Sequence, residues 1–570
     1  MEWHGVTRGA IGYYPSGRHP RNIITHSPTA KAPHAVPTAF RQPRPVGAVY
    51  PTNEKPEMLN NEVASLTGNL GAPDFWRELA RLGSAIEKLQ DGRMEIPSAV
   101  DRLSINPTLQ LLQPSWTIQS SIAERRKDPS GGKMKPEEWV LVWKDPRTGE
   151  IRADPALEED LLVLKMVVEG IDPGEVAAKG GLPVGAVDRA LDRALDRAVR
   201  RGILLAPRSL IRRDPATFPA GEGTEDLFLS ARAFTLQWHI TQACDLHCKH
   251  CYDRSDRYSP TLDQAVEILD DLRSFCRSRY VKGQVSFSGG NPLLYPHLTN
   301  VYRATSDRGF AISILGNPAP REQIEELLAI QRPTFFQVSL EGLPEHNDQI
   351  RGAGNFKRTS EFLGVLRDLG VPSTVMLTLT KENIDQVLPL AEMLRGLADS
   401  FTFNRLSPVE EGAKLELAGR EEFAALLDAY LAAAAHNPIM GLKDNLFNIV
   451  RRRRGLKPSG GCSGCGCGAA FNFLSLLADG EVHACRKFPS RIGNAFAQGL
   501  SEIYESEMAR RYRAGCSDCR DCVIRPVCGG CLAVGYGTGL DILEERDPYC
   551  FMQKGQSNNR SQPGMRIPEA

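Results

Sequence analysis

Three cysteines lie close together in the stretch "TQACDLHCKHCYDRS": Cys244, Cys248 and Cys251. A structural zinc site takes four protein ligands, and a disulfide framework takes an even number of cysteines. A cubane iron-sulfur cluster has four iron corners, so three thiolates leave one iron available to a ligand that is not protein. The spacing therefore predicts an iron-sulfur site with one open position.

The other cysteines gather near the C-terminus. The chain has 570 residues and 14 cysteines; none precedes Cys244, and the stretch from Cys462 to Cys550 contains most of them. The sequence shows neither a long apolar span nor an apolar signal core, so we expect a cytoplasmic protein that does not bind membranes. Thiols stay reduced in that compartment, which favours metal ligands over disulfides. Zinc knuckles remain an alternative for the Cys-x2-Cys pairs.

The elements that position the first three cysteines alternate between apolar strands and amphipathic helices. Alternation of this kind predicts a parallel sheet with helical crossovers. Six such units are too few for a closed eight-stranded barrel, so we expect an α/β fold with a partial (β/α)6 TIM-like barrel. The expected strands are residues 234–240, 284–290, 310–317, 335–342, 372–381 and 401–408. Cys244 follows the first of them, at the edge where parallel sheets bind ligands.

The cysteine triad on this loop resembles the signature of the radical S-adenosylmethionine (radical SAM) family. The resemblance implies a [4Fe-4S] cluster whose fourth iron binds SAM. "SFSGGNP" resembles the family's glycine-rich motif, although Asn291 stands where an acidic residue is usual, and further stretches resemble those that contact the methionine and the ribose. The cofactor-binding residues implied are Tyr252, Gly289, Gly290, Asn291, Pro292, Asn317, Ser339, Glu341 and Arg351. His250 stands where an aromatic residue normally precedes the third cysteine. No catalytic residue is identified.

The C-terminal cysteines resemble the SPASM extension of peptide-modifying radical SAM enzymes, which implies two auxiliary [4Fe-4S] clusters. The family's interleaved pattern assigns one cluster to Cys462, Cys467, Cys485 and Cys531. It assigns the second cluster to Cys519, Cys522, Cys528 and Cys550. Only two residues separate Cys528 from Cys531, where three are commoner. Cys276, Cys465 and Cys516 receive no ligand role, and Cys276 lies among apolar residues of a helix, which favours core packing.

A smaller module precedes the barrel. The stretch "EEWVLVWKDPRTGEIRAD" predicts a hairpin. A first helix is expected to start at Asp154 and Pro155 and to end at Gly170, and a second is expected to start at Asp172 and Pro173. An apolar stripe from Val187 to Val199 predicts a third helix. This winged-helix-like order resembles the RiPP recognition element, which binds leader peptides. We expect the strand from Trp139 to Trp143 to offer a free edge for a peptide strand. An inert structural domain is the alternative, and alternation of Asp with Arg on the third helix disfavours nucleic acid binding.

These patterns divide the chain. The expected ranges are a disordered extension at 1–57, a helical region at 58–136, the recognition-element-like module at 137–207, the barrel at 230–455, the auxiliary-cluster domain at 460–555 and a disordered tail at 556–570.

The resemblance implies a maturase that generates a 5′-deoxyadenosyl radical and modifies a ribosomally made precursor peptide, most similar to selenobiotic-type maturases. Its partners would be that precursor, bound through its leader, and an external electron donor such as a flavodoxin or ferredoxin. One alternative is a formylglycine-forming sulfatase maturase; these place an acidic base after a cluster cysteine, where this chain has Arg486. A zinc-binding winged-helix transcription regulator is the alternative from another class.

Overall fold

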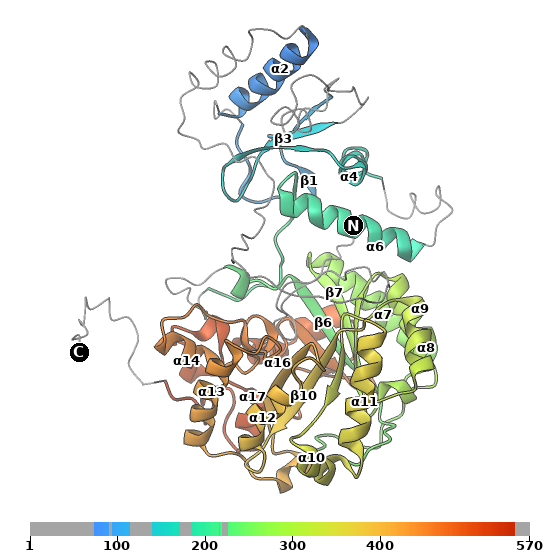
Figure 1. The fold of residues 1–570 in the computed structure, drawn as a ribbon, viewed down its shortest axis with the longest axis vertical. Helices are drawn as coiled ribbons and strands as arrows, with labels where there is room; N and C mark the ends of the chain where they lie inside the picture. Colours follow the sequence, from blue (N-terminus) through green and yellow to red (C-terminus); the bar gives the residue numbers. More distant parts are fainter. Residues whose placement is uncertain are drawn as a thin grey trace, which may run out of the picture. The chain divides into compact units, whose positions relative to one another are not determined.

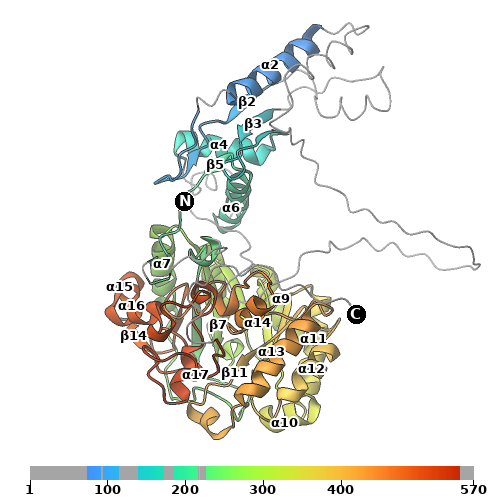
Figure 2. The same ribbon diagram turned by 90° about the vertical axis from the view of Figure 1, so that its left-hand side faces the viewer.

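The computed structural model describes residues 73–90, 94–113, 139–171, 184–215, 217–218 and 226–552 (Figures 1 and 2). The chain divides into two compact units, a smaller one formed by residues 16–183 and 187–208 and a larger one that contains residues 209–570. The expected disordered ends at 1–57 and 556–570, and the helix expected after Asp172, lie outside the described residues. In the described part of the chain, no helix is both long and apolar enough to cross a bilayer.

The larger unit is built on a parallel sheet that contains all six expected strands. They run in the order β11-β10-β9-β8-β7-β6, and each pairs in parallel with its neighbour. The strands are β6 (Ala233–Thr241), β7 (Lys282–Gly289), β8 (Ala311–Leu315), β9 (Phe336–Ser339), β10 (Ser373–Leu379) and β11 (Ser400–Arg405). Most of their side chains are buried, as expected for strands covered on both faces. The predicted partial barrel is confirmed.

Helices connect these strands and cover the sheet. Helix α7 shows the local signals clearly, because Thr261 accepts a hydrogen bond from the backbone of Gln264 and the Gln264 side chain bonds back. Helices α7, α8, α9 and α11 lie along one side of the sheet in Figure 1. The helices are α7 (Leu262–Ser278), α8 (Leu298–Asp307), α9 (Arg321–Ile330), α10 (Pro344–Arg351), α11 (Asn355–Asp368), α12 (Val387–Met393), α13 (Arg420–Ala434) and α14 (Phe447–Arg453).

The C-terminal region continues the barrel sheet, which the sequence did not predict. Strand β12 (Phe473–Leu476) pairs in parallel with β6, and β13 (Glu481–His483) and β14 (Arg491–Asn494) follow as an antiparallel extension. Helix α15 (Leu500–Glu505) packs on α7, and the two lie side by side in Figure 2. The remaining helices are α16 (Glu507–Ala514) and α17 (Leu532–Gly537). The cysteine-rich segment is therefore joined to the first barrel strand by backbone hydrogen bonds.

The smaller unit contains the predicted hairpin, but its strand from Val140 is not a free edge. Strand β3 (Val140–Lys144) lies between β2 (Gln110–Leu112) and β4 (Ile151–Pro155) in a three-stranded antiparallel sheet. The expectation of an edge at Trp139–Trp143 is wrong, because a segment before the hairpin pairs with that strand. Among the described residues, the free edges are those of β2 and β4.

The helices of the smaller unit differ from the prediction in one boundary. Residues Asp154 and Pro155 end β4 instead of starting a helix, and α4 (Glu158–Glu169) begins after Leu157. Helix α4 ends at Gly170, as predicted, with that glycine in the left-handed conformation. The third predicted helix is α6 (Val184–Arg201), and it buries Leu191, Ala194, Leu195 and Ala198.

The remaining segments of the smaller unit complete its described elements. Helix α2 (Pro73–Gln90) precedes the sheet. Strand β5 (Leu204–Leu205) follows α6 and pairs with β1 (Ser104–Ile105) in a separate two-stranded sheet. Trp143 of the central strand is fully buried, and its indole nitrogen donates a 2.8 Å hydrogen bond to the carbonyl of Arg201.

Candidate functional site

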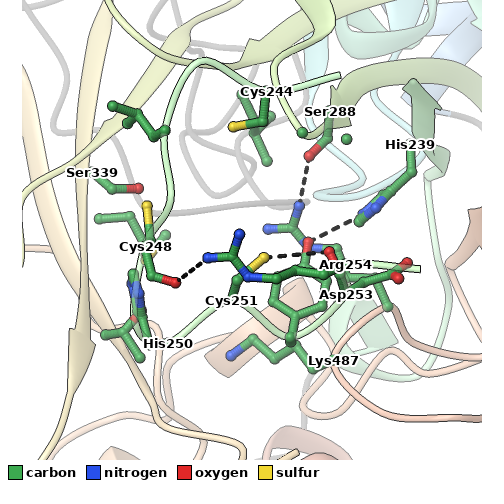
Figure 3. Close-up of a pocket in the computed structure, with 18 of the residues that line it drawn as sticks. His239, Cys244, Cys248, His250, Cys251, Asp253, Arg254, Ser288, Ser339 and Lys487 are labelled. Atoms are coloured by element: carbon green, nitrogen blue, oxygen red, sulfur yellow. Dashed lines mark hydrogen bonds between the residues drawn. The ribbon is translucent and has the colours of Figure 1, made fainter. Parts of the chain in front are cut away.

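The three clustered cysteines line one cavity at the carboxyl ends of the barrel strands. This barrel cavity has a volume of about 390 Å³, and Cys244, Cys248 and Cys251 all border it. Figure 3 shows the three cysteines with Ser339 and His239 around the cavity. All three thiols are free, and burial raises the pKa of Cys248 and of Cys251. The donor set and the room beside it fit a cluster together with a further ligand.

The glycine pair after β7 lets two loops approach each other. A Cβ on Gly289, whose φ is +135°, would lie 2.1 Å from the Thr241 carbonyl oxygen, and one on Gly290 would lie 2.3 Å from that of Ala243. The Gly290 amide donates a 2.8 Å hydrogen bond to Thr241. Both glycines line the cavity. A side chain at either position would also collide with the carbonyl groups of Thr241 and Ala243, where the cysteine loop begins.

Two asparagines hold the start of the cysteine loop. Asn317 Nδ2 donates to Asp245 Oδ1 over 2.7 Å and lies 3.7 Å from Cys244 Sγ, and Asn291 Nδ2 donates to the same carboxylate over 3.0 Å. Asn317 lines the cavity, whereas Asn291 and Pro292 do not. Asn291 is buried and its Oδ1 accepts from the amide of Leu293, so its side chain is directed to protein groups.

Glu341 lies behind the cavity wall. Its Oε1 accepts 2.9 Å hydrogen bonds from Arg351 and His250, and its Oε2 accepts from the Thr378 amide over 2.7 Å. Burial alone would raise the pKa of Glu341, but His250 and Arg351 lower it to about 2. Arg351, His250 and Ser339 line the cavity and Glu341 does not. The carboxylate therefore orients two cavity residues, and its oxygens face protein donors.

On the opposite side of the cavity lies a polar group of which the sequence singled out Tyr252 and Arg486 but not His239 or Ser288. The Tyr252 hydroxyl lies 3.3 Å from His239 Nε2, and Arg486 donates a 2.9 Å hydrogen bond to Ser288 Oγ. The guanidinium carbon of Arg486 lies 5.8 Å from the centre of the Tyr252 ring. Burial and the charge of Arg486 lower the pKa of His239 to about 3. No spacing in the sequence indicated that Ser288, His239 and Arg486 meet.

Four C-terminal cysteines line a second cavity, of about 80 Å³, which we call the four-cysteine cavity. These are Cys462, Cys467, Cys485 and Cys531, the set that the resemblance assigned to one cluster. Each backbone amide of the set is anchored. The amide of Cys462 donates to Asn445, that of Cys467 to the Cys528 carbonyl, that of Cys485 to Ser490 Oγ and that of Cys531 to Asp547.

The other four predicted ligands line a third, smaller cavity of about 20 Å³, the C-terminal cavity. These are Cys519, Cys522, Cys528 and Cys550. Arg525 borders the same cavity, and its buried Nη1 has no hydrogen-bond partner among the described residues. A buried guanidinium nitrogen without a partner is costly, and an anionic cluster held by four thiolates would supply its counter-charge. The residues present therefore fit an iron-sulfur cluster.

The barrel cavity and the four-cysteine cavity share part of their walls. The residues common to both are Leu315, Gln337, Asn404, Arg405, Arg486 and Lys487. Arg405 ends β11 and is buried; its guanidinium donates to Asp444 over 2.8 Å and to both oxygens of Asp547 over 2.9 and 2.7 Å. Since Asp547 also accepts from the amide of Cys531, this network links the last barrel strand to the auxiliary cysteines.

The three unassigned cysteines line none of these cavities. Cys276 is buried in the core, as predicted. Cys465 Sγ lies 3.7 Å from the Leu227 carbonyl oxygen. Cys516 is buried, and a hydrogen bond with Cys519 is the main cause that lowers its pKa.

Comparison with known proteins agrees with this geometry. Residues 238–394 match the radical SAM superfamily model, and residues 465–531 match the SPASM iron-sulfur cluster-binding domain. The chain is 28% identical to the AdoMet-dependent heme synthase of Methanosarcina barkeri, over 56% of this chain and 97% of that protein. It is also 28% identical to the mycofactocin maturase MftC of Mycolicibacterium smegmatis, over 55% of this chain and 82% of that protein.

A more distant relative is the subtilosin biosynthesis protein AlbA of Bacillus subtilis, 22% identical over 52% of this chain and 67% of that protein. Among solved structures, SuiB of Streptococcus suis bound to S-adenosylmethionine aligns with a TM-score of 0.47 and 18% identity, over 73% of this chain and 97% of that one. The two matched families bind a [4Fe-4S] cluster with SAM and auxiliary iron-sulfur clusters, respectively. Residues 238–394 are therefore a radical SAM domain, and residues 465–531 are a SPASM domain that follows it in the chain.

Proposed function

We propose that the protein is a maturase that modifies a ribosomally made precursor peptide. The observation that carries the proposal is the shared wall between a roomy three-cysteine cavity and a tight four-cysteine cavity. A substrate placed in the barrel cavity would contact residues that also border an auxiliary cluster. The MftC relatives are named as maturases and AlbA as a protein of bacteriocin biosynthesis, which supports a peptide substrate.

In this proposal, Cys244, Cys248 and Cys251 hold the cluster that binds SAM. When bound there, SAM supplies the 5′-deoxyadenosyl radical, which can remove hydrogen from an unactivated carbon. Arg351 and Asn317 provide polar groups at the cavity wall, and Glu341 fixes the direction of the Arg351 guanidinium. Ser339 and Tyr252 also face the cavity and complete the proposed SAM contacts.

Each auxiliary cluster would take four thiolates, as the two smaller cavities suggest. Full protein ligation leaves no open iron, so these clusters would serve electron transfer. An external carrier such as a flavodoxin or ferredoxin would deliver the electron that SAM cleavage requires. The protein's own part is to exclude water and fix the distances between the sites.

The smaller unit would bind the leader of the precursor. Its sheet has a free edge at β4 within the described residues, and an edge strand presents unpaired amide and carbonyl groups that a peptide strand can complement. The proposal thus moves the peptide from the strand that the sequence suggested, β3, to its neighbour.

Coexpression tests the function. The chain would be produced with each small peptide encoded beside its gene, and the peptides would be examined by mass spectrometry. We expect one peptide to change mass only when the chain is intact, and a Cys248→Ala variant to leave it unmodified. Unmodified peptides in every case would overturn the proposal. A sulfatase maturase is disfavoured because Arg486, a cation, occupies the position of the acidic base.

The heme synthase relative supports a second candidate, a heme precursor as substrate. Incubation of the reconstituted enzyme with SAM, a reductant and candidate heme precursors separates the two, since a heme synthase would release heme. We expect no heme to form.

A further inference from the structure

Arg486 occupies the junction between the barrel cavity and the four-cysteine cavity and lines both. It lies in the turn between β13 and β14, which is fixed by reciprocal hydrogen bonds between Cys485 and Ser490: the Cys485 amide donates to Ser490 Oγ over 3.1 Å, and Ser490 Oγ donates to the Cys485 carbonyl over 2.9 Å. The turn therefore fixes the backbone next to Arg486, and the hydrogen bond to Ser288 Oγ directs the guanidinium towards the barrel cavity.

Most of the Arg486 donors are not used by the protein. Among the described residues, the guanidinium makes one side-chain hydrogen bond, to Ser288 Oγ, and has no carboxylate within ion-pair distance. An arginine presents five N–H donors in a planar fork, and two of them can bind one carboxylate side by side. Arg486 is only half-buried, so its free donors can reach a molecule in the cavity.

The carboxylates that line these cavities are already occupied. Asp253 is the one in the described wall of the barrel cavity, and it accepts from Gln242 and Ser255. Asp444 is the one in the described wall of the four-cysteine cavity, and it accepts from Arg405. Neither is available to neutralise Arg486.

Two lysines also line the four-cysteine cavity: Lys487, which belongs to the shared wall, and Lys443, which does not border the barrel cavity. Figure 3 shows Lys487 at the cavity edge. Arg486 contacts Ser288 and the Tyr252 ring on the barrel side. A cluster held by four thiolates thus has Lys443 and Lys487 as counter-charges, and Arg486 is left for another anion.

We propose that Arg486 binds a carboxylate of the substrate, so that the enzyme selects peptides that present a C-terminal or side-chain carboxylate at the reacting position. The inference rests on the proposed peptide substrate, because peptides carry carboxylates and carboxylates match the guanidinium fork. The departure from an acidic residue after Cys485 then has a physical role: an aspartate there would repel the group that the arginine attracts.

Capture from synthetic peptides tests this site. The full-length enzyme, with reconstituted clusters and SAM, would be equilibrated with random hexapeptides in four pools, with a free or amidated C-terminus and with or without Asp and Glu, and bound peptides would be counted by mass spectrometry. We expect a preference of about tenfold or more for pools that carry a carboxylate, since hydrogen bonds to charged groups are the strong ones. The pool that is preferred distinguishes the C-terminal source from the side-chain source.

The variants make the test specific. Arg486→Gln should abolish the preference, and Arg486→Lys should retain part of it because the charge remains without the fork. Arg491→Gln is the matched control, since Arg491 lies in the neighbouring strand, is 63% exposed and pairs with Glu481 outside the cavities. It should keep the wild-type preference and the wild-type rate of SAM cleavage.

Equal capture of the amidated pool without Asp and Glu by the wild type would overturn the inference, as would a preference that survives in Arg486→Gln. Either result would leave peptide modification in the coexpression experiment standing. Conversely, a carboxylate preference without any modified peptide would retain Arg486 as an anion site and overturn the maturase proposal alone.

Discussion

The barrel cavity and the two auxiliary cavities differ in a way that separates their chemistry. The barrel cavity has three cysteines and about 390 Å³ of space, whereas the auxiliary cavities have four cysteines each and about 80 and 20 Å³. A site with room and a missing ligand can admit a small molecule to the metal. A tight site with a full set of thiolates can pass electrons but cannot bind a substrate at iron. In the proposed function, the three-cysteine cavity is the reaction site and the two four-cysteine cavities hold clusters that transfer electrons.

The largest effect is expected from the barrel cysteines. Replacing Cys244, Cys248 and Cys251 by alanine should abolish formation of 5′-deoxyadenosine from SAM, because no cluster can then present an open iron. Iron should fall from about twelve to about eight atoms per chain, since two four-iron clusters remain. The measurements are product chromatography and iron analysis of anaerobically purified protein. Deoxyadenosine at the wild-type level in this variant would break the distinction between the cavities.

Replacement of Arg405 tests whether its ion pairs link the auxiliary region to the barrel. Arg405→Met leaves Asp444 and Asp547 buried without their cation, which typically costs about 3–5 kcal/mol. We expect a lower melting temperature and loss of auxiliary iron, measured by calorimetry and iron analysis. Arg308→Met, which breaks a pair with the exposed carboxylate of Asp270, is the control and should change less. Full iron occupancy with unchanged melting would show that the network does not hold the two regions together.

Removal of the module at residues 137–207 should weaken binding of a leader peptide by about tenfold or more and leave SAM cleavage without substrate intact. The reason is that all three proposed cluster sites lie in the larger unit. Fluorescence anisotropy of a labelled leader measures the affinity. A leader that binds the shortened chain as tightly as the full chain would place recognition elsewhere.

The smallest effect concerns Glu341. Glu341→Gln retains a side-chain acceptor but removes the negative charge that orients Arg351 and His250, so the KM for SAM should rise by about tenfold with a smaller change in kcat. The pKa of about 2 lies below the ordinary value for glutamate, so the stabilising effect of this carboxylate is complete above that ordinary value and is lost as the pH falls towards 2. The melting temperature of Glu341→Gln should therefore fall less than that of the wild type as the pH is lowered. An unchanged KM would indicate that Arg351 does not contact SAM.

Much of the barrel could be predicted because its signals are local. Strands such as Phe336–Ser339 lie in short, largely apolar stretches between amphipathic helices, and each of the six expected strands appears in the sheet. The grouping of the eight auxiliary cysteines came from a family resemblance, and their two cavities match that grouping.

Features that depend on distant segments could not be predicted. Strand β12 pairs with β6, although more than half of the larger unit's sequence separates them. Strand β2 pairs with β3, the strand that was expected to be a free edge. The meeting of Ser288 with Arg486 is of the same kind, because one residue ends a barrel strand and the other lies in a turn of the SPASM domain. Asp154 and Pro155 were misassigned because a strand end and a helix start share the same residue types.

Electron paramagnetic resonance of the reduced, reconstituted enzyme with and without SAM tests the central claim most directly. The three-cysteine cavity predicts that the signal of one cluster changes when SAM is added while the signals of the other two do not, and that the change disappears in the Cys244, Cys248 and Cys251 triple variant. Spectra that are identical with and without SAM would contradict the account, because no iron would then be open to it.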